Sequence, residues 1–215
     1  MKKPLIIVLS ILSGVIAGFL IWGAIYAFTG FSIFSREPAP PAVSAKINSA
    51  ELTALAYSVL DTIRDEDFAA LSLVAHPELG VVFSPCATIN LSTNRCFLPE
   101  QIAAFGTDTQ RYMWGVYTSD GKPIELTPAE YFAEFILDRD YSSAPLIGVN
   151  RIVRSGNALD NITEVFRDAK FVDLHVPGNE DDDGEDYQWS SLRLGFEEFD
   201  GELRLTIILH SQWTA

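Results

Sequence analysis

The sequence predicts an α+β domain, with helices packed on one side of a curved antiparallel sheet, behind an N-terminal apolar segment. Residues 5–29 contain no charged side chain. Apolar residues between positions 52 and 76 recur with helical spacing, whereas those after position 170 alternate with polar residues, as in strands with one buried face. Helices early in a chain and strands late in it are typical of an α+β domain.

The apolar segment, residues 5–29, is long enough to be a membrane-spanning helix. A helix needs about 20 apolar residues to cross the hydrocarbon core, while the apolar region of a secretory signal has about 7 to 15. Trp22 and Tyr26 suit the headgroup level at its far end. Lys2 and Lys3 favour a cytoplasmic N-terminus, residues 1–4, and an exported C-terminal domain. We therefore expect a single-pass signal-anchor, with a domain secreted after signal cleavage as the alternative.

Residues 30–47 are predicted to form a linker, because prolines at positions 38, 40 and 41 favour an extended spacer. Residues 48–215 then form the folded part, and about 170 residues fit one domain better than two. Gly14 and Gly18 form a small-xxx-small pair in the apolar segment, which permits two anchors to pack together. A homodimer is therefore an open alternative.

The folded part is strongly acidic. The chain has a net charge of −14, and every Asp and Glu lies at or beyond position 37. Nucleic acid and anionic lipid headgroups are bound through clustered Lys and Arg, so neither is an expected partner of this domain. The expected partners are the membrane, through the anchor, and an unknown small ligand or envelope protein.

Local patterns predict three helices. The first has a stripe of apolar residues on one face and Ser49 placed as its N-cap. Its members are Leu52, Leu55, Ala56, Val59, Leu60 and Ile63. A shorter helix is expected from Asp65 and ends before His76, since the proline that follows disfavours helical geometry in the residue ahead of it. Residues 127–130 (TPAE) form a capping box with proline at the first helical position.

Cys86 and Cys96 are the two cysteines of the chain. Residues 87–91 and 95–98 have the composition of two strands joined by a turn, and this hairpin places the cysteines opposite each other. A bridge is possible where two Cα atoms come within about 7 Å, and an exported domain meets oxidising conditions. We therefore predict a disulfide, with two free thiols as the alternative. These cysteines supply too few ligands for a metal.

Three half-buried strands are predicted near the C-terminus from alternating apolar residues. Their apolar positions are Val172, Leu174 and Val176; Leu192, Leu194 and Phe196; and Leu203, Leu205, Ile207 and Leu209. Asp200 and Gly201 predict a two-residue hairpin that pairs Phe199 with Glu202. Continued without interruption, this register pairs Phe196 with Leu205, Leu194 with Ile207 and Leu192 with Leu209 on one face.

The same register gathers polar residues on the opposite face of the predicted sheet. They are Trp189, Ser191, Arg193, Thr206, His210 and Gln212, joined from a neighbouring strand by His175 and Asp173. Such groups can orient a small polar ligand, so this face is the candidate ligand-binding surface. The solvent-facing side of a sheet is the alternative. For catalysis, which needs a base and a group that orients it, the candidates are His175, His210 and Asp173.

An acidic run at residues 179–186 (NEDDDGED) is a weak candidate for calcium. Asn179, Asp181 and Asp183 fall at the first, third and fifth positions of an EF-hand loop, but Ser190 stands where the motif requires glutamate. A solvated acidic loop is therefore the expected interpretation, and weak calcium binding is the alternative. No cofactor is expected, because no segment carries a cofactor motif.

Five longer segments stand out: residues 76–85 (HPELGVVFSP), 114–117 (WGVY), 121–124 (GKPI), 191–194 (SLRL) and 210–214 (HSQWT). Together they resemble a family of uncharacterised bacterial surface proteins and lipoproteins. The likeness covers nearly the whole predicted domain and implies no particular activity. The sequence departs from the family at Cys86, in its acidic loop, and in having no lipid-bearing cysteine. More loosely, helices followed by a curved sheet are similar to the nuclear-transport-factor-2-like (NTF2-like) cone fold, which hosts enzymes, binding proteins and structural modules.

These observations favour a membrane-anchored, extracytoplasmic module that binds a ligand or another protein. The alternatives are a small hydrolase or isomerase that uses His210 or His175 with an acidic partner, and a structural protein of the cell envelope. Whether the protein is an enzyme is open, although the lack of a catalytic motif favours a binding module.

Overall fold

The computed structural model describes residues 48–180 and 186–213. The chain divides into two units, Met1–Ser44 and Ala45–Ala215, and the described residues belong to the second. The predicted anchor (5–29) and linker (30–47) lie outside the described residues. Within the two described ranges, no helix combines the length and the apolar character needed to cross a bilayer.

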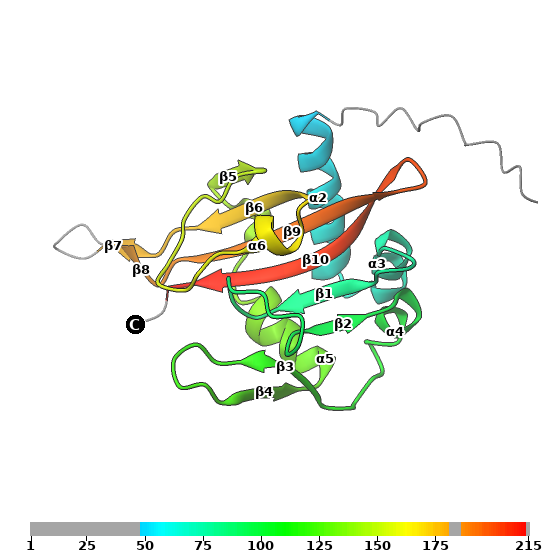
Figure 1. Cartoon of the computed structure of the whole chain (residues 1–215), viewed down its shortest axis with the longest axis horizontal. Coiled ribbons are helices and arrows are strands. Elements are labelled where there is room, and N and C mark those ends of the chain that lie inside the picture. The colour runs from blue at the N-terminus through cyan, green and yellow to red at the C-terminus, as the bar shows by residue number, and fades with distance from the viewer. Residues whose placement is uncertain (1–47, 181–185, 214–215) are drawn as a thin grey trace, which may run out of the picture. The chain divides into compact units, whose positions relative to one another are not determined.

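The described part contains short helices and a large sheet (Figure 1). The helices are α2 (Ser49–Arg64), α3 (Phe68–Val74), α4 (Pro99–Ala103), α5 (Pro128–Tyr131), the π-helix η1 (Phe132–Ile136), the 3-10 helix η2 (Tyr141–Ser143) and α6 (Ile162–Val165). The strands are β1 (Val81–Ser84), β2 (Arg95–Phe97), β3 (Tyr112–Val116), β4 (Pro123–Leu126), β5 (Leu146–Val149), β6 (Lys170–Val176), β7 (Asn179–Glu180), β8 (Asp186–Tyr187), β9 (Ser190–Phe199) and β10 (Glu202–Gln212).

Six of these strands form one sheet in the order β2-β1-β10-β9-β6-β5, while β3 with β4 and β7 with β8 form separate pairs. β1 runs parallel to β10, and the other neighbours in the six-stranded sheet are antiparallel. The α+β class is confirmed, but the sheet is mixed instead of wholly antiparallel. No sequence pattern indicated this parallel pairing, because β1 is buried along its whole length and therefore lacks the alternation of a half-buried strand.

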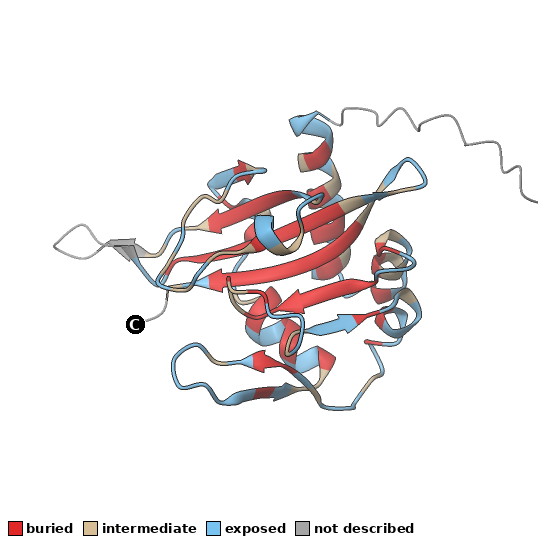
Figure 2. Cartoon of the chain, in the orientation of Figure 1, coloured by how far each residue is buried: buried red, intermediate tan, exposed pale blue. Residues whose placement is uncertain are grey.

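Helices cover one face of the sheet, and this face holds the main apolar core. Buried residues are concentrated in β1, β6, β9 and β10 (Figure 2). The stripe of α2 packs into this core as predicted; its buried members are Leu52, Ala56, Val59, Leu60 and Ile63. Phe83 of β1 lies at the centre of an aromatic group within the core. Its ring is within 6.0 Å, centre to centre, of Phe97, Phe105, Trp114, Tyr131 and Phe132.

The predicted helices form at the expected places, with small differences in their caps. Asn48 caps α2 instead of Ser49, because its side chain accepts from the backbone N–H of Glu51 in a reciprocal capping box. Asp67 caps α3 instead of Asp65. The capping box at residues 127–130 is confirmed, and α5 continues directly into η1.

The hairpin of β9 and β10 begins as predicted. The turn at residues 200–201 pairs Phe199 with Glu202, and the register continues as expected to Phe196 and Leu205. The dipeptide turn therefore fixes the first part of the hairpin.

Beyond this point a β-bulge at Thr206 shifts the register by one residue, which the sequence analysis did not predict. The pairs become Ile207/Gly195, Ile208/Leu194, Leu209/Arg193, His210/Leu192, Ser211/Ser191 and Gln212/Ser190. Gly195 permits the shift, because a Cβ at this position would lie 2.5 Å from Cγ2 of Ile207. Since side chains alternate along a strand, every residue of β10 after the bulge points to the face opposite to the predicted one.

The predicted hairpin around the cysteines is wrong. The pairing of β1 with β2 places Cys96 opposite Val82, and Cys86 lies in the loop after β1. Both cysteines are free; Cys86 Sγ donates to Thr88 O at 3.3 Å, and Cys96 Sγ donates to Leu79 O at 3.1 Å. The structure therefore contains no Cys86–Cys96 disulfide. Burial raises the pKa of both thiols, which keeps them protonated near neutral pH.

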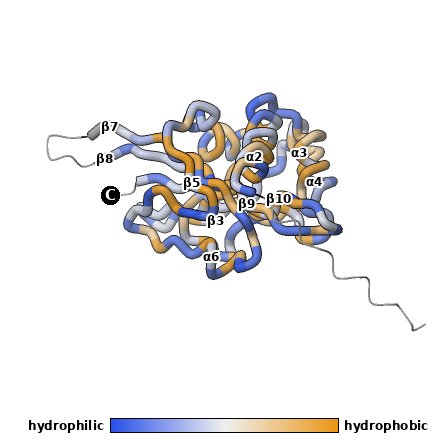
Figure 3. The backbone as a smooth tube through the Cα atoms, turned by 90° about the horizontal axis from the view of Figure 1, so that it is seen from above, coloured by the Kyte–Doolittle hydropathy of each residue, from blue (hydrophilic) through white to orange (hydrophobic). Residues whose placement is uncertain are grey.

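Residues 150–166, here called the outer segment, cover the other face of the sheet. Figure 3 shows α6 of this segment on the opposite side of the strands from α2, α3 and α4. The segment packs on a second apolar cluster of Val82, Ile89, Ile162, Phe171, Ile207 and Leu209. The chain itself therefore covers the face that was predicted to bind a ligand or to face solvent. The central residues of this face are buried, so they neither form an open ligand-binding surface nor face solvent.

Candidate functional site

Four polar side chains meet on the helix-covered face of the sheet: Asp138, Tyr141, Ser190 and His210, here called the His210 cluster. Ser190 Oγ lies 2.6 Å from the Tyr141 hydroxyl and 2.9 Å from His210 Nε2. Tyr141 donates to Asp138 Oδ1 at 2.7 Å, and Ser190 donates to Asp138 Oδ2 at 3.1 Å. His210 Nε2 lies 3.4 Å from the same Oδ2. Asp138 keeps 19% of its side chain exposed, while the other members are buried.

Distant parts of the chain bring this cluster together. Asp138 follows shortly after η1, and Ser190 is the first residue of β9. The bulge in β10 turns His210 toward this face, where its ring lies 5.6 Å from that of Phe135. Of the predicted catalytic candidates, His210 therefore has an acidic partner, and that partner is Asp138, which the sequence analysis did not single out.

The His210 cluster contains the residue types of a Ser-His-Asp triad without its geometry. In a triad, the acid binds the ring nitrogen that faces away from the serine. Here Asp138 and Ser190 both approach Nε2, and Nδ1 lies 3.5 Å from Pro85 O. Because the serine hydroxyl is buried and surrounded by these partners, it lacks the access that a nucleophile needs.

The neighbours of Asp138 keep its carboxylate ionised. Burial alone would raise the pKa of Asp138, but hydrogen bonds from His210, Tyr141 and Ser190, with the charge of His210, lower it below its ordinary value. Burial and the charge of Asp138 raise the pKa of Tyr141 far above its ordinary value, so Tyr141 remains a neutral donor. A carboxylate with a lowered pKa is a weak general base, so the cluster fits an orienting role better than proton abstraction.

A pH-dependent contribution to stability follows from the lowered pKa of Asp138. A lowered pKa in the folded state stabilises the fold above the unfolded pKa, and this contribution is lost as pH falls through the folded pKa. We expect the difference in unfolding free energy between the wild-type chain and Asp138→Asn to be fully present near pH 5 and to shrink below about pH 4. Urea unfolding across this pH range measures it; a difference that is unchanged down to about pH 2.5 contradicts the assignment.

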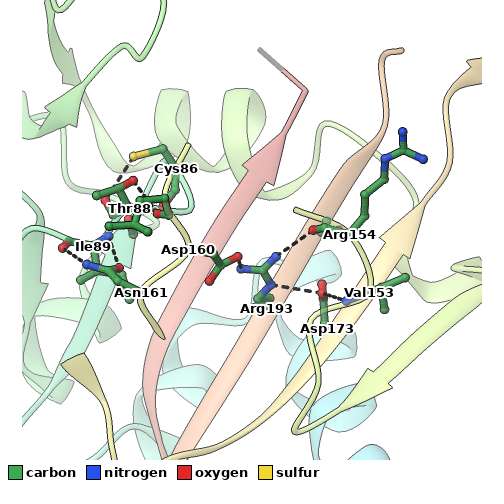
Figure 4. Close-up of polar contacts among 12 residues, drawn as sticks. Cys86, Thr88, Ile89, Val153, Arg154, Asp160, Asn161, Asp173 and Arg193 are labelled. Carbon is green, nitrogen blue, oxygen red and sulfur yellow. Dashed lines mark hydrogen bonds and ion pairs between the residues drawn. The ribbon is translucent and has the colours of Figure 1, made fainter. Parts of the chain in front are cut away.

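Under the outer segment, Arg193 lies between two aspartates (Figure 4). Its guanidinium forms an ion pair with Asp160, and Nε lies 3.2 Å from Asp173 Oδ2, within ion-pair distance but outside hydrogen-bond geometry. Arg193 also donates to Arg154 O at 3.3 Å, and Asp173 Oδ2 accepts from Val153 N at 2.7 Å. Because Arg193 and Asp173 are completely buried, these contacts fasten the outer segment to the sheet and present nothing to solvent.

His175 belongs to the same covered face. Its Nδ1 lies 2.8 Å from Ser191 Oγ, and its ring is 5.6 Å from that of Trp189. Trp189 is buried against Gly156 of the outer segment, where a Cβ would lie 3.1 Å from the indole. His175 is therefore buried among structural partners.

The sheet thus divides the predicted ligand-binding residues. Trp189, Ser191 and Arg193 lie under the outer segment with His175 and Asp173, whereas His210 lies on the helix-covered face. Thr206 is buried at the bulge, and its hydroxyl donates to Gly195 O at 3.3 Å. Gln212, at the end of β10, borders an open pocket.

This pocket has a volume of about 200 Å³ and lies between the β3–β4 loop, η1 and the end of β10. It is lined by Pro85, Val116, Tyr117, Thr118, Ser119, Ile124, Phe135, Gln212 and Trp213. The β3–β4 loop and the C-terminal end of β10 lie on the same side of this unit (Figure 1). Phe135 separates the pocket from His210, since its ring contacts both. Tyr117 and Trp213 belong to the segments WGVY and HSQWT, but nothing in the sequence indicates that these segments meet.

The acidic run, residues 179–186, is described only at its two ends. β7 and β8 pair at its two ends, with Asn179 opposite Tyr187, while Asp181 and Asp183 lie outside the described residues. Calcium binding there stays a prediction. Within the described ranges, no group of His, Cys, Asp and Glu is arranged to hold a metal ion.

Comparisons with known proteins identify no family. No protein-family model and no curated protein matches the chain, so the likeness to bacterial surface proteins stays a prediction. The 1.8 Å structure of Aln2 from a Streptomyces species is 12% identical, with a TM-score of 0.34, over 76% of this chain and 88% of that one. A chain named Rd1NTF2_05, with several substitutions, is 12% identical, with a TM-score of 0.30, over 74% of this chain and 95% of that one. At these TM-scores neither likeness carries an argument about function.

Proposed function

We propose that this protein is a membrane-anchored, extracytoplasmic module of NTF2-like type that binds a small ligand in the pocket beside Phe135 and Gln212. The observation that carries the proposal is the pocket itself, which opens at one edge of a domain whose other sequence-predicted polar residues are buried. Most ligand sites are concave, with aromatic and apolar walls and a few polar groups that orient the ligand. The walls here fit that description.

The arrangement of the sheet and its helices supports the proposal. Helices cover one face of a sheet whose longest hairpin contains a bulge, which bends the bulged strand. The pocket lies where β10, the bulged strand, ends. The NTF2-like assignment is therefore part of the proposal.

A second candidate function is an isomerase or hydrolase, favoured by the contact of His210 with Asp138 and Ser190. Burial of the serine and the lowered pKa of Asp138 weaken it. The two candidates differ in the effect of His210→Gln, which retains a hydrogen-bonding side chain and removes the imidazole. If the wild-type protein converts a bound compound to a product and His210→Gln does not, the enzyme is favoured. If both bind the compound equally and neither converts it, the binding module is favoured.

Ligand binding is tested by a thermal-shift screen of the full-length chain in mild detergent against small neutral, anionic and cationic metabolites. Thr118→Trp fills the pocket from its rim, and Thr109→Trp is a matched control at an exposed position away from it. We expect each true ligand to bind wild type and Thr109→Trp alike and to lose about tenfold or more in affinity to Thr118→Trp. A complete lack of hits, or hits that Thr118→Trp binds equally well, would rule the pocket out.

Membrane anchoring and export are supported by the uncharged segment at residues 5–29 and by the lysines that precede it. A phosphatase reporter that is active only outside the cytoplasm, fused after Ala215, is expected to be active and to sediment with membranes. Soluble reporter released from cells would indicate cleavage of the segment, and activity confined to the cytoplasm would overturn the topology.

A further inference from the structure

We infer that the pocket beside Phe135 and Gln212 selects a small organic cation, such as an amine or a quaternary ammonium compound. This inference rests on the proposed function, because it names the class of ligand for the same pocket. Three features of the pocket support a cation: the aromatic side chains of its walls, the charges in contact with them, and its volume.

Aromatic rings form much of the pocket wall. Tyr117, Phe135 and Trp213 approach from β3–β4, η1 and the end of β10, and the rings of Tyr117 and Phe135 are 6.3 Å apart at an angle of 39°. The faces of such rings carry negative potential and attract cations, and groups of them are used to bind quaternary ammonium ions.

The charges next to the pocket favour a cation as well. Among the described residues that line it, none carries a positive charge. The Tyr117 hydroxyl donates to Glu134 Oε1 at 2.8 Å, and this hydrogen bond raises the pKa of Tyr117, so the phenol stays neutral beside a carboxylate. Asp120, in the β3–β4 loop, is paired with Lys122 at 2.6 Å. Among the described residues, Glu134 therefore supplies a carboxylate in contact with the wall that no ion pair with Lys or Arg neutralises.

The remaining wall groups suit the rest of such a ligand. Thr118, Ser119 and Gln212 offer hydroxyl and amide groups that can bind a polar substituent. A volume of about 200 Å³ accommodates a trimethylammonium group with a short chain. The net charge of −14 also raises the local concentration of cations around the protein.

The test compares choline with its uncharged isostere 3,3-dimethylbutan-1-ol by isothermal titration of the full-length chain in a non-ionic detergent. The two probes have nearly the same shape and differ in charge. We expect choline to bind at least about tenfold more tightly than the isostere, as cation–π contacts with several rings predict.

Two variants separate the contribution of charge from that of apolar contact. Trp213→Leu keeps an apolar side chain without the ring, and Glu134→Gln keeps a hydrogen-bond acceptor for Tyr117 without the charge. Each is expected to weaken choline binding by about threefold to tenfold and to leave the isostere nearly unaffected. Glu100→Gln, at an exposed position in α4, is the matched control and should change neither affinity.

Equal affinity for choline and the isostere would overturn the inference and leave the pocket as a ligand site. Choline binding that survives Thr118→Trp would place the cation elsewhere and also overturn it. If neither probe binds, the inference fails, while the proposed function still depends on the metabolite screen. A melting temperature close to that of wild type shows that each variant is folded.

Discussion

Arg193→Met is expected to lower the free energy of unfolding by about 3–5 kcal/mol, because it leaves two buried carboxylates without their cation. Asp173 is completely buried and the Asp160 side chain is 6% exposed, so neither can be solvated in the folded state. The outer segment should detach first, since its contacts through Asp160 and Arg154 O depend on the guanidinium. Urea unfolding measures the stability, and hydrogen exchange of residues 150–166 measures detachment.

A combined variant separates the loss of a cation from the loss of packing. Arg193→Met with Asp160→Asn and Asp173→Asn removes all three charges and keeps an oxygen at position 173 to accept from Val153 N. It should be clearly more stable than Arg193→Met alone, because no buried charge is left unpaired. If Arg193→Met by itself costs less than about 1 kcal/mol, the ion pairs do not hold the outer segment.

Phe83→Ala is expected to cost about 3–5 kcal/mol, the range typical of removing a buried aromatic ring. Phe83 is fully buried and its ring contacts those of Phe97, Trp114 and Tyr131, so the cavity would open at the centre of the aromatic core. The more the surrounding side chains collapse into the cavity, the smaller the loss of stability within this range. Thermal and urea unfolding of the full-length chain measure it.

Two other variants calibrate this result. Phe83→Leu keeps most of the apolar volume and should lose less than half as much stability as the alanine variant. Leu73→Ala removes an apolar side chain that is 75% exposed, and it should change stability by less than about 0.5 kcal/mol. Similar losses for Phe83→Ala and Leu73→Ala would mean that the aromatic group is not the core of the fold.

Local sequence signals predicted the elements that depend on neighbouring residues. The capping box at residues 127–130 and the turn at residues 200–201 formed as expected, because each consists of hydrogen bonds within a few positions of the chain. β1 was missed, because its four buried residues show no alternation and its partner β10 lies far later in the chain. The disulfide prediction failed for a related reason: it assumed a strand after Cys86, whereas the strand ends before it.

The candidate site was harder to predict than the fold. The sequence analysis singled out His210 and Gln212, but their surroundings depend on a bulge that no short sequence pattern predicts. Asp138 follows the π-helix η1, which the capping box at residues 127–130 does not reveal, and its contact with His210 joins residues 72 positions apart. Periodicity assigns a residue to a face of its own strand; it does not identify the residues that face it from elsewhere in the fold.

Thr206, the extra residue in β10, inverts the alternation of side chains between the two faces of the sheet partway along the strand. Before Thr206 the strand follows the alternation set by the turn, and after it the alternation is inverted. If Thr206 instead paired with Gly195 and the strand continued without a bulge, the two faces would be exchanged along the rest of β10: the imidazole of His210 would lie among the apolar residues under the outer segment, and Leu209 would take its place beside Phe135. A single backbone irregularity therefore decides whether the histidine and Asp138 share one side of the sheet or lie on opposite sides of it.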